Sequence, residues 1–85
     1  MSGEQMKYVY LIRSKQSPAQ TYVGLTHDVQ KRLAAHNAGQ SSHTSKYAPW
    51  ELVAFFGFTE RRKAAAFEEY LKSGSGRAFA SKRLW

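Results

Sequence analysis

The apolar segment that follows Pro49 limits the possible folds of this chain more than any other feature. Residues 50–58, Trp-Glu-Leu-Val-Ala-Phe-Phe-Gly-Phe, form its most apolar stretch. This stretch is far shorter than the roughly 20 residues that span a bilayer. Short apolar runs of this kind are typical of strands whose two faces are both covered. The segment therefore predicts a strand, and we expect it at the centre of a sheet.

Two further segments supply the strands that such a sheet needs. Residues 8–12, Tyr-Val-Tyr-Leu-Ile, and residues 21–25, Thr-Tyr-Val-Gly-Leu, are rich in β-forming side chains. Between them, the polar segment 13–20 contains one proline and predicts a turn. We expect an antiparallel hairpin in which Tyr8 and Tyr10 share one face, because side chains alternate along a strand.

A first helix is predicted between the hairpin and the apolar strand. Thr26 or Asp28 can cap its start, and Gly39 stands just past its expected end. Residues four positions apart lie on the same side of a helix, which here gives a buried apolar stripe and a polar stripe beside it. The apolar stripe is Val29 with Leu33, and the polar stripe is Arg32 with His36.

A second helix is predicted over residues 60–72, with Thr59 as its cap. Its apolar face, which should pack on the sheet, consists of Ala64, Phe67 and Leu71. The Ser-Gly-Ser-Gly sequence at 73–76 predicts the end of this helix. The order β-β-α-β-α indicates the α+β class, with a small three-stranded antiparallel sheet flanked by helices. Residues 1–85 would form one domain, with 74–85 as a basic C-terminal extension packed on or near it.

Charge favours nucleic acid as the partner. The 85 residues include 13 Lys and Arg against 6 Asp and Glu, a net charge of +7, and such an excess attracts polyanions. The absence of cysteine excludes disulfides, a thiolate zinc site and a cysteine nucleophile. Residues 1–7 do not have the pattern of a secretory signal, so we expect a cytoplasmic protein with no membrane partner. The candidate nucleic-acid-binding residues are Arg32, Lys72, Arg77, Lys82 and Arg83.

Two tyrosine triplets and three polar residues form the most specific pattern. The triplets are Tyr-Val-Tyr at 8–10 and Tyr-Val-Gly at 22–24, and Arg32, His36 and Glu68 follow them. This combination resembles the GIY-YIG nuclease family over nearly the whole chain. The chain is most similar to the small single-domain bacterial members related to the N-terminal nuclease domain of the excision-repair nuclease, excinuclease C.

The resemblance implies a fold and an activity. It implies a metal-dependent endonuclease that hydrolyses DNA phosphodiester bonds, leaves 5′-phosphate and 3′-hydroxyl ends, and acts in DNA repair or recombination. One divalent ion, Mg²⁺ or Mn²⁺, would be held by Glu68, because Mg²⁺ accepts a single carboxylate together with waters and substrate phosphate. Arg32 would bind the phosphate through its planar, permanently charged guanidinium. Tyr8 and Gly24 would belong to the structural motif.

The group that activates the attacking water has two candidates. Tyr10 and Tyr22 correspond to the active-site tyrosines of the family, and Tyr22 is the first choice for the base. Several members carry a lysine directly after the second triplet, but Leu25 stands there in this chain. This departure gives more weight to His36, which can orient the water, accept its proton or act on Tyr22.

Two other functions are compatible with the same residues. A non-catalytic nucleic-acid-binding module would keep the fold and the basic surface. A protein-interaction module of a larger nuclease complex would use an exposed apolar patch around Phe79, Leu84 and Trp85. A nuclease this small should have low sequence specificity unless a protein partner supplies it.

Overall fold

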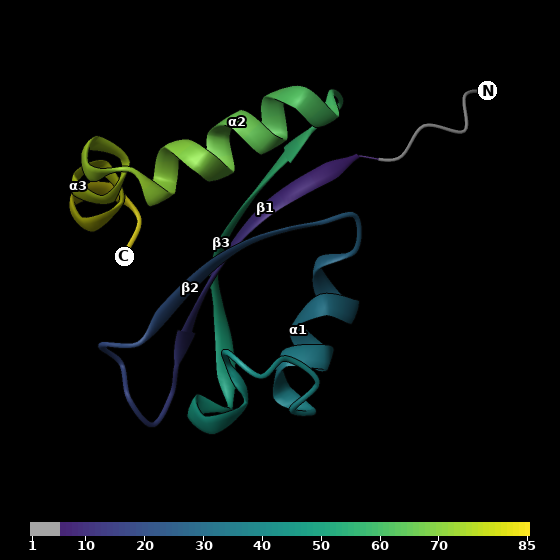
Figure 1. Cartoon of the computed structure of the whole chain (residues 1–85), viewed down its shortest axis with the longest axis vertical. Helices are drawn as coiled ribbons and strands as arrows, with labels where there is room; N and C mark the ends of the chain where they lie inside the picture. Colours follow the sequence, from purple (N-terminus) through teal and green to yellow (C-terminus); the bar gives the residue numbers. More distant parts are fainter. Residues whose placement is uncertain (1–5) are drawn as a thin grey trace.

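The computed structural model describes residues 6–85, and its three strands form one antiparallel sheet (Figure 1). The strands are β1 (Lys7–Ser14), β2 (Thr21–Thr26) and β3 (Trp50–Phe58), in the order β2-β1-β3. The predicted α+β class with a three-stranded antiparallel sheet is confirmed. Residues 1–5 lie outside the described residues. They begin the predicted domain, and they belong to the segment 1–7 in which no secretory signal is expected.

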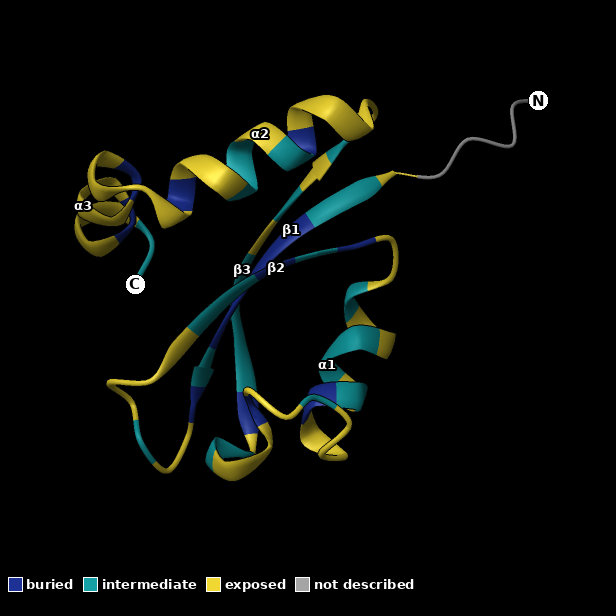
Figure 2. Ribbon diagram, viewed as in Figure 1, coloured by how far each residue is buried: buried dark blue, intermediate teal, exposed yellow. Residues whose placement is uncertain are grey.

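The central strand is β1, so the prediction that the segment 50–58 lies at the centre of the sheet is wrong. Val9, Tyr10, Leu11 and Ile12 of β1 are all buried, which Figure 2 shows as dark blue along this strand. In β3, by contrast, Phe55 is 53% exposed. The apolar residues of β3 cover an edge of the core, and mean apolarity alone does not distinguish an edge strand from a central one.

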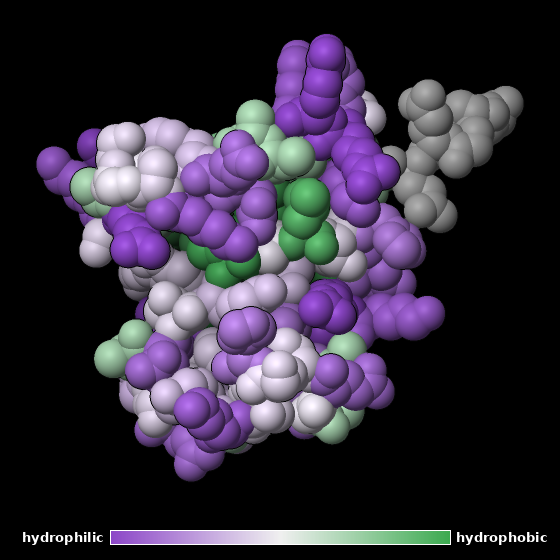
Figure 3. Space-filling model, in the orientation of Figure 1, coloured by the Kyte–Doolittle hydropathy of each residue, from purple (hydrophilic) through white to green (hydrophobic). Residues whose placement is uncertain are grey.

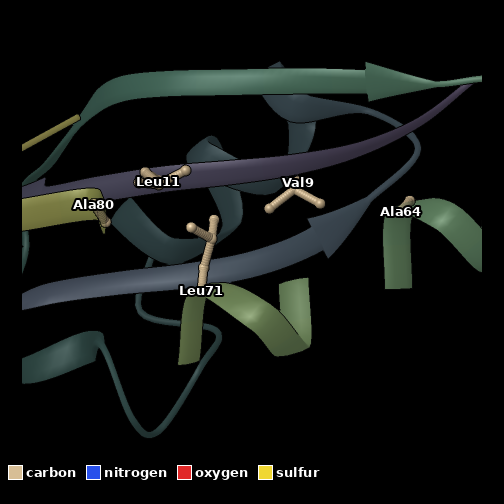
Figure 4. Close-up of a cluster of buried hydrophobic side chains, with 5 residues drawn as sticks. All are labelled: Val9, Leu11, Ala64, Leu71 and Ala80. Carbon is tan, nitrogen blue, oxygen red and sulfur yellow. The ribbon is translucent and has the colours of Figure 1, made fainter. Parts of the chain in front are cut away.

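Helices cover both faces of the sheet. The helix α1 (Val29–Asn37) lies on one face, and α2 (Arg61–Lys72) with α3 (Gly74–Arg83) lies on the other (Figure 1). Alternate residues of β1 enter two separate clusters, since successive side chains of a strand point to opposite faces. The cluster under α2 and α3 is Val9, Leu11, Ala64, Leu71 and Ala80, shown in Figure 4. The cluster under α1 is Tyr10, Ile12 and Trp50, with Val29 and Leu33 packed against it.

The helix α3 occupies most of the segment for which the sequence predicted only a basic extension. Ser73 ends α2 and also caps α3, because its hydroxyl accepts a hydrogen bond from the backbone N–H of Gly76 at 3.2 Å. The glycines at 74 and 76 disfavour a helix by propensity alone. The serine cap and packing of Ala80 in the core outweigh that preference.

The remaining helix ends agree in part with the sequence. The carboxylate of Asp28 caps α1 by accepting from the backbone N–H of Lys31 at 3.0 Å. Gly39 follows the helix with φ 77°, a conformation that favours glycine. Glu60, and not Thr59, is the N-cap of α2, and its side chain makes no capping hydrogen bond. No helix among residues 6–85 is both long and apolar enough to cross a membrane.

Two glycines of α3 should respond in opposite ways to alanine. A Cβ at Gly76 would overlap the backbone carbonyl of Tyr70, whereas a Cβ at Gly74 would have nothing within 4 Å. We expect Gly76→Ala to lower the free energy of unfolding by about 1–3 kcal/mol, as overpacking does. Gly74→Ala should raise it by up to about 1 kcal/mol, because alanine loses less backbone entropy in a helix. Urea denaturation of both variants measures this difference, and equal effects would contradict the close approach of α3 to α2.

Candidate active site

The two triplets meet because the hairpin pairs Tyr10 with Gly24. These residues lie opposite each other in the register of β1 and β2. A Cβ at Gly24 would overlap the hydroxyl end of the Tyr10 ring. The glycine of the second triplet therefore leaves the space that the tyrosine of the first triplet occupies, on the sheet face that α1 covers.

A chain of hydrogen bonds runs from Arg32 through Tyr10 and His36 to the loop after α1. The Nε of Arg32 donates to the Tyr10 hydroxyl at 3.4 Å, and this hydroxyl lies 2.8 Å from Nε2 of His36. On the other side of the ring, Nδ1 of His36 lies 2.7 Å from the Thr44 hydroxyl. Since a guanidinium only donates, every group is satisfied when Tyr10 donates to His36 and Nδ1–H donates to Thr44.

Tyr22 completes this group of side chains. Its ring centroid lies 5.1 Å from that of His36, edge to face, and 6.2 Å from that of Tyr10. We call the four residues Tyr10, Tyr22, Arg32 and His36 the Tyr–His cluster. Within it Tyr10 and His36 are buried, while Tyr22 and Arg32 are half-buried and thus the members that a substrate can reach.

The two members of the polar stripe on α1, Arg32 and His36, differ in their exposure. His36 is fully buried, and both of its ring nitrogens have partners. A buried imidazole is tolerated here because Tyr10 and Thr44 replace the hydrogen bonds of water. Arg32, one helical turn earlier, keeps partial contact with solvent.

The charges of the cluster perturb one another. Burial raises the pKa of the Tyr10 phenol, the hydrogen bond from Arg32 opposes this rise, and the negative charge of Glu68 adds to it. The hydrogen bond to Tyr10 in turn raises the pKa of Arg32. Burial, followed by the positive charge of Arg32, lowers the pKa of His36. The cluster thus holds a neutral phenol and a neutral imidazole beside a guanidinium cation.

The lowered pKa of His36 predicts a loss of stability in mild acid. The unfolded chain takes up a proton at His36 near its ordinary pKa of about 6.5, whereas the folded chain takes it up only at lower pH. The contribution of neutral His36 to the free energy of unfolding is therefore complete above the pKa of His36 in the unfolded chain. It is lost as the pH falls through the pKa of His36 in the folded chain. We expect the unfolding free energy in urea to drop between pH 7.5 and pH 5.5. His36→Gln should flatten this pH dependence, whereas His27→Gln should not. Parallel curves for wild type and both variants would refute the assignment of the pH dependence to His36.

Glu68 comes from the face of the sheet opposite to α1. It lies on α2, its side chain is 19% exposed, and its carboxylate accepts from Nζ of Lys72 at 2.6 Å. Its partner Lys72 lines the same cavity as Tyr22, so the carboxylate lies near the strand that carries Tyr22. The carboxylate thus already accommodates one positive charge.

The donor set around Glu68 fits a Mg²⁺-type ion. Among residues 6–85, no group of three or more histidines and carboxylates is arranged to hold a metal. A closed zinc site needs such a group. Mg²⁺ instead keeps several waters and is bound through one or two carboxylates plus substrate phosphates. Glu68 offers a single half-buried carboxylate, which is compatible with such an ion.

A cavity of about 650 Å³ lies along β2 and connects the Tyr–His cluster with α2 and α3. Tyr22 lines it on the strand side, and Lys72, the ion-pair partner of Glu68, lines it on the helix side. Arg77 of α3 also lines it. The face seen in Figure 3 is mostly hydrophilic around a smaller apolar area.

Other candidate residues lie away from the cluster. Lys82 and Arg83 are exposed on the last turn of α3 and do not line the cavity. Tyr8 packs edge to face on Phe55 with 5.8 Å between ring centroids. Leu25 packs in the core on the α2 side of the sheet and therefore points away from Tyr22. The sequence correctly assigned Tyr8 and Leu25 to strands but missed the helix that carries Lys82 and Arg83, and the fold places all four away from the Tyr–His cluster.

Two residues that support the site were missed by the sequence analysis. Thr44 is buried, and its backbone carbonyl accepts from the indole of Trp50 at 2.9 Å. The side-chain amide of Asn37 binds both the backbone N–H and the carbonyl of Trp50, at 2.5 and 3.2 Å. These bonds hold the loop after α1 against His36. No local pattern signals them, because each joins residues that only the tertiary fold brings together.

Known proteins resemble this chain over most of its length. A family model described as the GIY-YIG catalytic domain matches residues 6–82. A UPF0213 protein of Clostridium perfringens is 37% identical over 68 residues, which cover 79% of this chain and 71% of that protein. The solution NMR structure of a UPF0213 protein from Bacillus halodurans matches with a TM-score of 0.54 and 27% identity, covering 92% of this chain and 84% of that one.

Longer proteins contain a similar segment. A homologue of the structure-specific endonuclease subunit SLX1 from Giardia intestinalis is 37% identical over 65 residues, which are 72% of this chain. The match spans only 18% of the Giardia protein. An SLX1 structure-specific endonuclease subunit from Ajellomyces capsulatus is 40% identical over 65 residues, which span 15% of its length. The family resemblance that the tyrosine triplets predicted is confirmed, whereas the nearer likeness to excinuclease C stays a prediction.

Proposed function

Because the chain belongs to the GIY-YIG family, we propose that it is a metal-dependent endonuclease that hydrolyses DNA phosphodiester bonds at the Tyr–His cluster. One observation carries the proposal: four elements bring a phenol, a guanidinium and a carboxylate to one edge of the sheet. Tyr22 comes from β2, Arg32 from α1 and Glu68 from α2, while Tyr10 of β1 joins them through its hydrogen bond to Arg32. Phosphodiester hydrolysis needs these groups together, to neutralise the phosphate and to hold the attacking water.

Arg32 binds the scissile phosphate. Its Nε is engaged by Tyr10, so the guanidinium is fixed in orientation before the substrate arrives. The remaining N–H groups form a planar fork that matches two phosphate oxygens. Because Arg32 keeps its positive charge, it offsets the charge that builds up on the phosphate as water attacks.

Tyr22 holds the attacking water. It is the half-buried phenol of the cluster, whereas both ring nitrogens of His36 are already occupied. The water oxygen attacks phosphorus and gives up a proton, the bond from phosphorus to the 3′ oxygen breaks, and that oxygen takes up a proton, so the products carry a 5′-phosphate and a 3′-hydroxyl. Tyr10 and His36 act as positioning residues, because they fix Arg32 and the ring of Tyr22 without facing solvent themselves.

Glu68 would hold the divalent ion, Mg²⁺ or Mn²⁺. When bound, the ion supplies positive charge that stabilises the phosphate and the departing 3′ oxygen. Lys72 must then exchange its contact with Glu68 for another anion, and the DNA backbone offers one. This exchange would link metal binding to substrate binding at the same edge of the cavity.

The names of the relatives support a finer proposal about substrate and partner. The Giardia and Ajellomyces proteins are named structure-specific endonuclease subunits. We infer that this domain acts on DNA of a particular structure and that a protein partner contributes to its choice. A role in DNA repair or recombination and a cytoplasmic location stay predictions.

Labelled oligonucleotides test the proposed function. Duplex, single-stranded and branched DNAs are incubated with the protein in Mg²⁺, in Mn²⁺ and in EDTA. We expect cleavage with either metal and none in EDTA, and fragments that DNA ligase reseals without prior phosphorylation. Salt-sensitive binding without cleavage of any substrate would instead favour the non-catalytic binding module.

A further inference from the structure

The cavity along β2 has a lining that the proposed hydrolysis does not use in full. Besides Tyr22 and Lys72, its lining includes Trp85, Arg77, Thr21 and Ser81. Its volume of about 650 Å³ lies within the range of roughly 300–1,000 Å³ that is typical of sites for small organic ligands. The lining thus combines aromatic surface, positive charge and hydrogen-bonding groups in one place.

Trp85 is held in position at the wall of this cavity. Its backbone N–H donates to the carbonyl of Ala80 at 2.9 Å, and its carbonyl accepts from Arg13 at 3.3 Å. The side chain is half-buried and packs against the core cluster beneath α2 and α3. Trp85 therefore packs on the protein and also borders the cavity, a placement suited to an aromatic platform on which a base stacks.

Arg77 supplies the charge next to this platform. Lys72 is already paired with Glu68, whereas the ion pairs found among residues 6–85 do not include Arg77. Arg77 is exposed on the first turns of α3 and borders the same cavity. A guanidinium beside an indole can bind the phosphate of the nucleotide whose base is stacked.

We propose that this cavity is a subsite for one unpaired nucleotide of the DNA substrate, with the base stacked on Trp85 and its phosphate on Arg77. The inference rests on the proposed function, because the nucleotide belongs to the strand that the Tyr–His cluster cleaves. Tyr22 borders both the cluster and the cavity, so the unpaired nucleotide lies next to the scissile phosphate. A base inside a continuous duplex presents only its edges, so stacking on Trp85 requires a nucleotide outside the helical stack.

Binding of short DNAs in EDTA tests this subsite without cleavage. Fluorescence anisotropy compares a blunt duplex with the same duplex carrying a short single-stranded tail at its 5′ or its 3′ end. Wild type should bind at least one tailed duplex more tightly than the blunt one. Trp85→Ala should weaken binding to that tailed duplex by about tenfold and binding to the blunt duplex by less than about twofold.

Matched variants distinguish the loss of base stacking from a general loss of structure. Trp85→Phe keeps an aromatic face and should stay within about threefold of wild type on the tailed duplex. Phe79→Ala removes an exposed aromatic on α3, one that packs on Tyr70 and does not line the cavity, and should leave the tail preference unchanged. Arg77→Gln should weaken tail binding and reduce its salt slope by about one.

These binding outcomes test the subsite separately from the nuclease activity. Equal affinities for tailed and blunt duplexes in wild type would overturn the subsite, as would an unchanged tail preference in Trp85→Ala. Binding of free dAMP without any tail preference would overturn it as well, because the cavity would then accept nucleotides but not a DNA strand. A tail preference that depends on Trp85 would support the subsite even in a protein that fails to cut DNA.

Discussion

Replacing Glu68 by glutamine is expected to slow DNA cleavage by about a hundredfold to a thousandfold while leaving the fold intact. Glutamine keeps the size of the side chain but removes the negative charge that would hold the divalent ion. The pair of Glu68 with Lys72 is partly solvent-exposed, and such pairs contribute only about 0–1 kcal/mol to stability. The melting temperature should therefore change little, and single-turnover kinetics at saturating Mg²⁺ measure the loss.

The neighbouring residue provides the matched control. Glu69 is exposed on the same helix and carries the same charge, so Glu69→Gln alters net charge equally without touching the cluster. Its cleavage rate should remain within about twofold of wild type, as is usual for surface substitutions away from a site. Comparable losses in the two variants would indicate that overall charge, rather than a metal ligand, explains the effect of Glu68→Gln.

Arg32→Lys is expected to slow cleavage by about a hundredfold although the positive charge is retained. Lysine offers a point charge in place of a planar fork, and it cannot reproduce the bond from Nε to the Tyr10 hydroxyl. Loss of that hydrogen bond should also cost about 0.5–1.5 kcal/mol of unfolding free energy. Cleavage rates and urea denaturation of the same preparation measure the two effects separately.

Lys31 is the control for this substitution, because it is exposed on the same helix. Lys31→Gln lowers the net charge by one, which Arg32→Lys does not, and should slow cleavage only through weaker binding. Raising the protein concentration should restore its rate. If Arg32→Lys were restored in the same manner, Arg32 would be a general DNA contact and not a group that acts on the scissile phosphate.

The sequence predicted the secondary structure better than the arrangement of the strands. Alternation in residues 8–12 and the turn at 13–20 correctly placed Tyr10 and Gly24 in a hairpin. The apolar run of β3 was wrongly predicted to lie at the sheet centre. Hydropathy does not show which strand the helices cover on both faces, and in this fold that strand is β1. The helix α3 was missed since glycine propensity is a local property, whereas Ser73 capping and burial of Ala80 depend on what surrounds them.

The site could be predicted only as far as residue identity. Spacing along the chain identified Tyr10, Tyr22 and Arg32 as candidate site residues, and the fold brings them together with His36. Helical periodicity assigned His36 to a polar stripe with Arg32, but it could not show that Thr44 in the following loop bonds to this ring. The sequence placed Trp85 in an apolar patch with Phe79 and Leu84, and its place beside the cavity follows from contacts between chain segments far apart in sequence.

The most direct test of the central claim is the cleavage of one end-labelled branched DNA by the wild-type protein, first in Mg²⁺ and then with excess EDTA. Binding to the same DNA is measured in parallel by anisotropy. We predict a defined cut in Mg²⁺ that EDTA abolishes while binding persists. Binding of equal strength with no cut in Mg²⁺ or Mn²⁺ would contradict the claim that the Tyr–His cluster and Glu68 hydrolyse DNA.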